Sequence, residues 1–313
     1  MTEAVDPAAL LDAARAGDRA ALARLLSLVE RGGPDARAVG RLTHPLGGAG
    51  YAVGLTGAPG AGKSTLTNAL VAHVRGGDEP VAVLAIDPSS PFTGGAILGD
   101  RVRMQDHTGD PGVFIRSMAT RGHLGGLSLA TLEAMRLLDA TGWPWIVVET
   151  VGVGQVEVEV ARAADTTVVV VNPGWGDAVQ ANKAGLLEIA DVFVINKADR
   201  PGVDEARRDL ERMLDLTGAS GWRPPIVATS ATTGAGVAEL WQGINEHRDH
   251  LTQSGGLEAR RTARVADELT EIVAALLRDR AKATAGEHLD RLAAKVAARA
   301  IDPWTAAEEL LPD

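Results

Sequence analysis

The apolar positions of this chain follow two periodicities, which divide it into three regions. In the middle of the chain, short runs of consecutive apolar residues alternate with stretches in which apolar residues recur at helical spacing. Such runs are typical of strands buried on both faces, and we expect strands at 51–56, 81–86, 112–116, 145–149, 166–171, 191–195 and 225–229. This alternation predicts the α/β class, with a mostly parallel central sheet covered by helices on both faces.

Both ends of the chain have the pattern of helices rather than strands. Asp6-Pro7 is a typical start of a first helix, and a second helix is expected to end near Gly32-Gly33-Pro34. After Ser254-Gly255-Gly256, which has the composition of a linker, helical spacing returns. We therefore expect three parts, namely an N-terminal helical segment at 1–49, an α/β domain at 50–252 and a C-terminal helical extension at 253–313.

The C-terminal extension contains an apolar stripe that needs a covering surface. Its members lie at helical spacing and are Val265, Leu269, Ile272, Val273, Leu276 and Leu277. A second helix is expected around Leu289, and a third begins at Asp302-Pro303. The stripe either folds back on its own domain or pairs with another chain, and the periodicity leaves both options open.

Composition excludes several classes of protein. The 313 residues carry a net charge of −10, which argues against nucleic acid or an anionic membrane as the main partner. There is no cysteine, which excludes disulfides, thiolate metal sites and cysteine nucleophiles. No apolar stretch has the length of about 18 residues that a membrane span needs, and the first residues lack the pattern of a secretion signal. We therefore expect a cytoplasmic protein.

A glycine-rich segment separates the first predicted strand from a helical pattern. Its three glycines allow positive φ, so that successive N–H groups can point at phosphate oxygens beside the positive end of a helix dipole. Lys63 is expected to reach the β- and γ-phosphates, and the Ser64 hydroxyl to ligate Mg²⁺. Thr65 contacts the nucleotide, or caps or packs the helix. The predicted nucleotide-binding loop is Gly57, Ala58, Pro59, Gly60, Ala61, Gly62, Lys63, Ser64 and Thr65.

A second nucleotide-binding segment follows a later strand. Asp199 can accept hydrogen bonds from the N1–H and the exocyclic amine of guanine, whereas adenine offers neither donor in that arrangement, so ATP is disfavoured. Asn196 is expected to support the loop and approach the base edge, and Lys197 to lay its stem against the base plane. Ser230-Ala231 matches the loop whose backbone N–H binds guanine O6 in GTPases. The predicted ligands are therefore GTP and its product GDP.

Acidic residues near the ends of two other strands are candidate magnesium ligands. Asp87 and Glu149 each end a predicted strand, and Asp100 lies in the loop after Asp87. Mg²⁺ takes oxygen ligands and retains waters, so each acid could hold it directly or through water, or could instead be a helix cap or a solvated loop acid. Gly152 could donate its backbone N–H to the γ-phosphate. No catalytic base is evident, so intrinsic hydrolysis is expected to be slow and to depend on a partner.

Two longer segments identify a family. Residues 87–104 are Asp-Pro-Ser-Ser-Pro-Phe-Thr-Gly-Gly-Ala-Ile-Leu-Gly-Asp-Arg-Val-Arg-Met, and residues 149–155 are Glu-Thr-Val-Gly-Val-Gly-Gln. Both closely resemble the MeaB/ArgK family of P-loop GTPases, the bacterial counterparts of the human methylmalonic aciduria type A protein. The resemblance covers about 50–236 by motif. It implies catalytic roles for Lys63, Asp87 and Glu149, and magnesium binding by Ser64, Asp87, Asp100 and Glu149.

The resemblance also implies a biological role. Members of this family are G protein chaperones of adenosylcobalamin-dependent acyl-CoA mutases, and they couple GTP binding and hydrolysis to cofactor loading and protection of the mutase. They form homodimers through C-terminal helices, which would cover the stripe described above. The segment 172–183 matches the family's switch toward the mutase, but departs from the common pattern at Trp175 and at Val179-Gln-Ala-Asn-Lys183. The expected partner is methylmalonyl-CoA mutase or a relative such as isobutyryl-CoA mutase.

Three other functions fit parts of the pattern. A metal-delivery GTPase of the nickel-chaperone kind needs soft or imidazole ligands, but the seven histidines show no clustered ligand spacing. An amino-acid-transport ATPase or kinase, a label that members of this family have carried, would use ATP, against which Asp199 argues. A nucleotide-controlled scaffold with negligible catalysis would share the same nucleotide site. There is no Asp-x-His-x-x-Gly cobalamin motif, so the mutase is expected to make any corrin contact.

Overall fold

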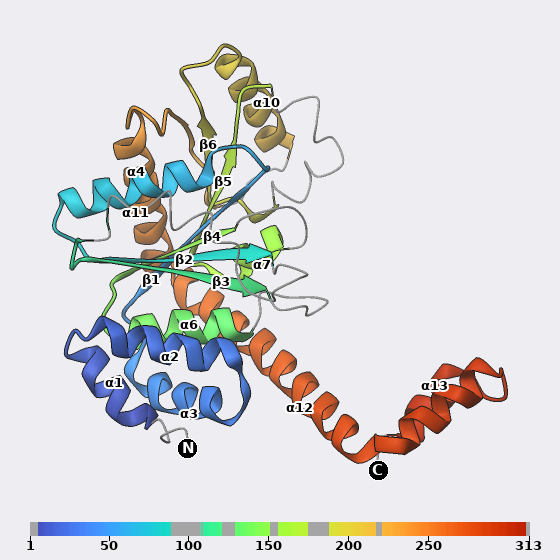
Figure 1. Ribbon diagram of the computed structural model, residues 1–313. Coiled ribbons are helices and arrows are strands. Elements are labelled where there is room, and N and C mark those ends of the chain that lie inside the picture. Colours follow the sequence, from blue (N-terminus) through green and yellow to red (C-terminus); the bar gives the residue numbers. More distant parts are fainter. Residues whose placement is uncertain are drawn as a thin grey trace. The chain divides into compact units, whose positions relative to one another are not determined.

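A seven-stranded sheet, in which all neighbouring strands are parallel, forms the centre of the protein (Figure 1). The computed structural model describes residues 6–88, 107, 109–120, 129–150, 156–174, 188–216 and 221–310. The strand order is β3-β2-β4-β1-β5-β6-β7. The strands are β1 Tyr51–Gly57, β2 Val81–Pro88, β3 Val113–Thr120, β4 Trp145–Thr150, β5 Thr166–Val171, β6 Val192–Asn196 and β7 Ile226–Thr229. The predicted α/β class with a parallel sheet is confirmed.

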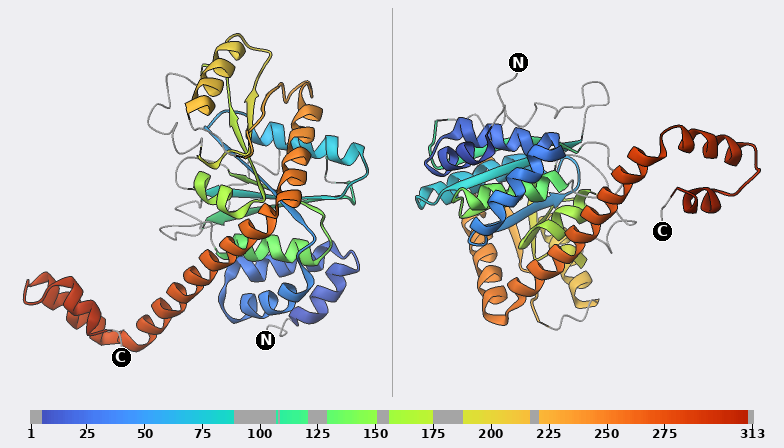
Figure 2. Two further views of the ribbon diagram at one scale, coloured as in Figure 1. Left: turned by 180° about the vertical axis from the view of Figure 1, so that it is seen from behind. Right: turned by 90° about the horizontal axis from the view of Figure 1, so that it is seen from below.

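Helices cover both faces of the sheet (Figure 2). One face packs against α4 (Lys63–Gly76) and α11 (Val237–Ser254). The other face packs against α6 (Leu129–Ala140), α7 (Val156–Ala163) and α10 (Val203–Leu216). Every residue of β1, β4, β5 and β6 is buried, which explains why these strands are continuous rather than alternating apolar runs.

Three helices precede the sheet, and their boundaries follow from capping. They are α1 (Pro7–Arg15), α2 (Arg19–Arg31) and α3 (Gly33–Thr43), with a short 3₁₀ turn at His44–Leu46. The side chains of Asp6 and Asp18 accept hydrogen bonds from backbone N–H groups in the first turns of α1 and α2. Gly32 ends α2 with a φ of 74°, which glycine adopts without steric strain.

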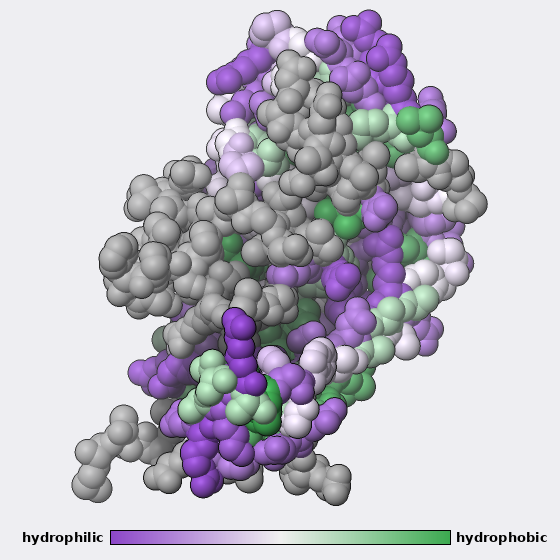
Figure 3. All heavy atoms as spheres, turned by 90° about the vertical axis from the view of Figure 1, so that its right-hand side faces the viewer, coloured by the Kyte–Doolittle hydropathy of each residue, from purple (hydrophilic) through white to green (hydrophobic). Residues whose placement is uncertain are grey.

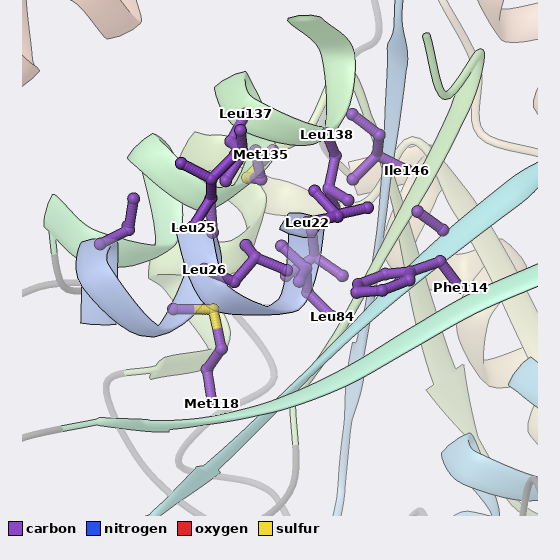
Figure 4. Packing of buried hydrophobic residues seen from close by; sticks show 14 of the residues in the cluster. Leu22, Leu25, Leu26, Leu84, Phe114, Met118, Met135, Leu137, Leu138 and Ile146 are labelled. Atoms are coloured by element: carbon purple, nitrogen blue, oxygen red, sulfur yellow. The ribbon is translucent and has the colours of Figure 1, made fainter. Parts of the chain in front are cut away.

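The N-terminal helices share a hydrophobic core with the sheet. Leu22, Leu25 and Leu26 of α2 are buried in one cluster with Leu137 of α6 and Met118 of β3 (Figure 4). Burying a leucine side chain fully contributes about 1.5–3 kcal/mol relative to leaving it exposed. Residues 6–46 therefore cover one face of the sheet and bury part of its core.

The chain forms two compact units, Met1–Arg261 and Thr262–Asp313. Helix α12 (Gly256–Ala297) follows α11 with only Gly255 between them, and the φ of 71° at that residue ends α11. The linker expected at Ser254–Gly256 is therefore a single residue, Gly255, in the left-handed region of backbone conformation. Glycine adopts this conformation readily, so one residue suffices to end α11 before α12 begins. Among the described helices, none combines the length and the apolar content needed to cross a membrane.

The second unit consists of the rest of α12 and a short final helix. The dihedrals of Gly286 (φ 32°, ψ −127°) interrupt α12, so the second helix expected around Leu289 is its continuation beyond this kink. Helix α13 (Pro303–Glu308) is capped by the side chain of Asp302, as the Asp-Pro pair predicts. Among the described residues beyond Gly286, Leu292 and Ala306 are buried.

Candidate functional site

The predicted nucleotide loops lie at one edge of the sheet. Because all strands are parallel, the carboxyl ends of β1, β4, β6 and β7 meet at the same edge. The glycine-rich loop follows β1, the Asn196–Asp199 loop follows β6, Ser230 and Ala231 follow β7, and Glu149 lies in β4. β1 lies between β4 and β5, where the strand order changes direction, and open α/β sheets bind ligands in the crevice at that point.

Two glycines of the first loop lie so close to neighbouring atoms that a side chain would not fit. Gly57 has a φ of 134°, and a Cβ there would lie 2.1 Å from the Val170 carbonyl oxygen. Gly62 has a φ of 90°, and a Cβ there would lie 2.5 Å from Nδ2 of Asn196. A side chain at either position would displace the loop from its neighbours. The glycines thus hold the loop against β5 and against the loop after β6.

Lys63 is the first residue of α4 and folds back over the loop that precedes it. Its Nζ donates to the carbonyl oxygens of Gly57 at 2.5 Å and Ala58 at 3.3 Å, and the residue is buried. Helix α4 is 14 residues long, and its N-terminus supplies backbone N–H groups and a favourable dipole for anions. Thr65, in the first turn, has an exposed side chain.

Ser64 and Glu149 join the first turn of α4 to the end of β4. The Ser64 hydroxyl donates to Oε1 of Glu149 at 2.5 Å, and the Glu149 side chain is fully buried. A hydroxyl and a carboxylate are oxygen donors of the type that Mg²⁺ prefers, so this pair fits a magnesium site. Among the described residues, no group of three or more His, Cys, Asp or Glu side chains forms a ready metal cluster.

Three predicted site residues and part of the predicted switch segment lie wholly or partly outside the described residues. Asp87 lies at the end of β2, where its backbone pairs with Ala119 of β3. Its side chain lies outside the described part of the protein, as do Asp100 and Gly152. The same holds for 175–183 of the predicted switch segment. Their roles remain predictions from the sequence.

Asn196 links the two nucleotide loops. Its Nδ2 donates to the carbonyl oxygens of Ala61 at 2.8 Å and Gly62 at 3.4 Å. Its Oδ1 accepts hydrogen bonds from the Thr229 hydroxyl and from the backbone N–H of Ala231, each at 3.2 Å. The predicted supporting role of Asn196 therefore extends to both loops. Sequence reasoning missed Thr229, whose only signal was a hydroxyl at the end of a strand.

The remaining base-loop residues surround Asn196. Lys197 adopts a φ of 60°, and its Nζ donates to the Gly60 carbonyl oxygen at 2.6 Å. Oδ1 of the exposed Asp199 accepts a hydrogen bond from the Ser230 hydroxyl at 3.0 Å. The backbone N–H of Ser230 donates to the Ala235 carbonyl at 2.9 Å. The structure thus brings Asn196, Lys197 and Asp199 together with the loop after β7.

A second polar cluster, which sequence reasoning missed, lies at the opposite edge of the sheet. The Thr166 hydroxyl lies 2.7 Å from the Tyr51 hydroxyl and 2.8 Å from Nδ1 of His247, and Nε2 of His247 lies 3.2 Å from Oδ1 of Asp191. Burial lowers the pKa of His247 to about 4, although the nearby Asp191 carboxylate opposes this shift. Burial likewise raises the pKa of Tyr51 to about 12.

Comparison with known proteins adds to this geometry. Residues 22–288 match a family model described as methylmalonyl Co-A mutase-associated GTPase MeaB. A protein named as a GTPase in Pyrococcus abyssi is 51% identical over 310 residues, which cover 97% of this chain and 95% of that protein. The mouse mitochondrial methylmalonic aciduria type A homolog is 39% identical over 216 residues, which cover 67% of this chain and 52% of that protein. The crystal structure of a LAO/AO transport system kinase is similar with a TM-score of 0.72 and 29% identity, and the match covers 98% of each chain.

Proposed function

The chain belongs to the MeaB family of GTPases, as its motifs predict, and we propose that it is a GTP-dependent chaperone of an adenosylcobalamin-dependent acyl-CoA mutase. The family description names methylmalonyl-CoA mutase as the associated protein, and the mouse relative carries the name of methylmalonic aciduria type A. In this proposal, GTP binding and hydrolysis accompany loading of the cofactor onto the mutase and protection of the mutase. The partner is a mutase of the methylmalonyl-CoA or isobutyryl-CoA type.

The observation that carries the proposed nucleotide chemistry is the joining of two loops by Asn196. Asn196, where the base loop begins, holds the Ala61 carbonyl of the phosphate loop and the Ala231 N–H of the loop after β7, so these loops keep a defined spacing. In the proposal, one guanine nucleotide spans them, with phosphates at the N-terminus of α4 and the base at Asp199. Asp199 selects guanine because an unpaired carboxylate would penalise adenine.

The proposed hydrolytic site includes Lys63, Asp87 and Glu149. Lys63 supplies positive charge to the β- and γ-phosphates, and Gly152 donates its backbone N–H to the γ-phosphate. Ser64 and Glu149, with Asp87 and Asp100, would hold Mg²⁺ directly or through water. A bound Mg²⁺ would neutralise charge that develops on the phosphate oxygens. We propose slow intrinsic hydrolysis, because the sequence assigns no residue to activate water.

We also propose that the second unit forms a homodimer. Val265, Leu269, Val273 and Leu277 are all exposed and lie four residues apart, which places them along one side of α12. Apolar surface lies beside polar surface on the outside of the molecule (Figure 3). In the described part of the chain, six of the eight exposed large apolar side chains belong to this unit, the other two being Leu46 and Leu216. Pairing with a second copy would remove this stripe from water.

A pair of aspartate variants tests the dimer. Leu269→Asp places a charge in the stripe, and Leu216→Asp places the same charge at an apolar side chain that is 86% exposed in the other unit. Sedimentation should give a dimer for the wild type and for Leu216→Asp, and a monomer for Leu269→Asp. A monomeric wild type, or a dimeric Leu269→Asp variant, would contradict the proposed interface.

The mutase partner is tested by assembly of purified components. The apo forms of methylmalonyl-CoA mutase and isobutyryl-CoA mutase are each mixed with the protein in the presence of GDP or of a non-hydrolysable GTP analogue. The proposal predicts a complex with at least one mutase, with an affinity that changes with the nucleotide. Lys63→Ala, which should abolish nucleotide binding, is the control and should remove that dependence. No complex with either mutase in any nucleotide state would overturn the chaperone proposal.

A transport-system kinase is the second candidate, and the name of the similar solved structure favours it. Such an enzyme would use ATP and phosphorylate a protein, whereas the loop at Asn196–Asp199 has the residues of a guanine site. Competition between GTP and ATP for the purified protein separates the two candidates. A preference for GTP supports the GTPase chaperone, and equal turnover of both nucleotides supports the kinase.

A further inference from the structure

Two adjacent arginines at the start of α12 hold the amino-terminal ends of three strands. Nη2 and Nη1 of Arg260 donate to Oδ1 and Oδ2 of Asp191 at 2.7 and 2.8 Å, a two-pronged pair. Nη2 of Arg261 donates to Oδ2 of Asp165 at 2.8 Å and to the Gly50 carbonyl at 2.7 Å. Asp191 precedes β6, Asp165 precedes β5 and Gly50 precedes β1. We call this set of contacts the arginine clamp.

The clamp cannot be released without cost, because both carboxylates are buried. Asp165 is 1% exposed and Asp191 is 5% exposed. Each is also fixed by the sheet, since Oδ2 of Asp191 accepts from the Thr167 N–H at 2.8 Å and Oδ2 of Asp165 accepts from the Ala52 N–H at 3.0 Å. Removing an arginine would take away a positive charge that faces a buried carboxylate, so the carboxylate would be driven to move with its strand or to take up a proton.

The clamped strands carry the two nucleotide loops at their other ends. β1 runs from Tyr51 to Gly57, where the phosphate loop begins, and β6 runs from Val192 to Asn196, where the base loop begins. Both strands are buried throughout, and β6 spans about 16 Å at the usual rise per residue. A shift of either strand along its axis at the clamped end would therefore move a nucleotide loop at the opposite edge.

We propose that Arg260 and Arg261 are positioning residues for guanine nucleotide binding. They fix the position of β1 relative to β6 along the strand axes. This position keeps the phosphate loop and the base loop at the distance that a single bound nucleotide spans. The inference rests on the nucleotide chemistry of the proposed function, and it adds that the first turns of α12 control nucleotide affinity. By linkage, a nucleotide that favours the clamped arrangement also strengthens the clamp by the same factor.

Variants with a matched control test the positioning role. Arg260→Gln and Arg261→Gln remove the clamp, and Arg223→Gln removes an exposed ion pair with Asp215 that has the same distance of 2.8 Å. Calorimetry measures the affinity for GDP, which touches both loops, and for pyrophosphate, which touches only the phosphate loop. The clamp variants should lose at least about fivefold in GDP affinity and keep their pyrophosphate affinity, while Arg223→Gln keeps both. Unchanged GDP affinity, or equal loss for both ligands, would overturn the proposal.

A second measurement uses the unaltered protein, in case the clamp variants do not fold. Amide hydrogen exchange is followed at 257–261 and at Asp191 and Val192, with and without GDP. The proposal predicts slower exchange at these positions when GDP is bound, although they lie at the edge opposite the nucleotide loops. Unchanged exchange at a saturating GDP concentration would contradict it. If the protein binds GDP but forms no complex with a mutase, the chaperone proposal is contradicted and the clamp proposal is unaffected.

Discussion

The carboxamide of Asn196 bridges two loops that lie far apart in the sequence. It donates to the carbonyl of Ala61, 135 residues earlier, and accepts from the N–H of Ala231, 35 residues later. Because the side chain is buried, water cannot replace these partners without rearrangement. Asn196, which is expected to approach the base edge, thus also sets the distance between the phosphate loop and the loop after β7.

Asn196→Ala should weaken the binding of GTP and GDP together. The substitution leaves the Ala231 N–H and the Thr229 hydroxyl without this acceptor, and such a loss costs about 1–3 kcal/mol, or about 5- to 150-fold in affinity. Fluorescent GDP titration measures the effect. Asn245→Ala removes a hydrogen bond that the side-chain amide donates to the Trp241 carbonyl within α11; this variant is the control and should bind normally. Normal binding by Asn196→Ala would refute the bridging role.

Glu149→Gln should separate magnesium-dependent hydrolysis from nucleotide binding. The amide keeps an oxygen for the Ser64 hydroxyl but loses the charge that favours Mg²⁺. GTP hydrolysis should fall about 10- to 100-fold and need more Mg²⁺, while GDP affinity without Mg²⁺ stays the same. Glu79→Gln, at a carboxylate that accepts from the Trp145 indole, should behave as wild type. If Glu149→Gln lost affinity for GDP without Mg²⁺ by the same factor as it lost GTP hydrolysis, the role of Glu149 would be structural.

Asp199→Asn should change which purine is bound. The Asp199 carboxylate accepts from the Ser230 hydroxyl and is expected to accept from the N1–H and amine of guanine. An amide at this position cannot accept two such bonds, but it can donate to the O2 carbonyl of xanthine. The affinity for GTP should fall at least about tenfold, and that for xanthosine triphosphate should rise. Competition titrations with both nucleotides test this, and an unchanged preference for GTP would place the base elsewhere.

His247 should make the protein lose stability in mild acid. Its pKa is about 4 in the folded protein because of burial, against an ordinary value of 6.5. Above pH 6.5 the ring is neutral in both states and contributes no pH dependence. As the pH falls from 6.5 toward 4, the unfolded chain binds a proton that the folded one does not, so stability falls by about 1.4 kcal/mol per pH unit.

The comparison of wild type with His247→Gln isolates this contribution. Urea unfolding is measured from pH 7.5 down to pH 5, and the free energies of unfolding of the two proteins are subtracted at each pH. The wild type should lose stability more steeply, by about 2 kcal/mol in total by pH 5. A constant difference across this range would mean that His247 titrates normally in the folded protein.

The sheet and the positions of the glycine-rich and Asn196–Asp199 loops at strand ends agree with the prediction from the sequence. Runs such as Thr166–Val171 are buried on both faces and therefore uniformly apolar, which is a strong local signal. Gly57 and Gly62 are predicted as loop glycines because the phosphate motif requires them, and the structure gives the steric reason. The local sequence pattern is sufficient to predict the position of a loop where a motif directly follows the end of a strand.

The contacts of the arginine clamp could not be predicted in the same way. Arg260 and Arg261 lie 69 and 96 residues from Asp191 and Asp165 in the sequence, and surface-type arginines on a helix give no sign of a buried partner. Likewise, the composition of Ser254–Gly256 suggests a linker. Composition alone does not distinguish a flexible glycine segment from a single glycine that ends a helix, as Gly255 does. In both cases the deciding information is the packing of distant segments.

The most direct test of the account is the GTP turnover of the purified protein with and without an apo acyl-CoA mutase. We expect slow hydrolysis by the protein alone and an increase of at least about tenfold with the partner mutase, because a partner can supply a group that activates water. Lys63→Ala should show no turnover in either condition. Turnover that stays the same with both methylmalonyl-CoA mutase and isobutyryl-CoA mutase would contradict the central claim.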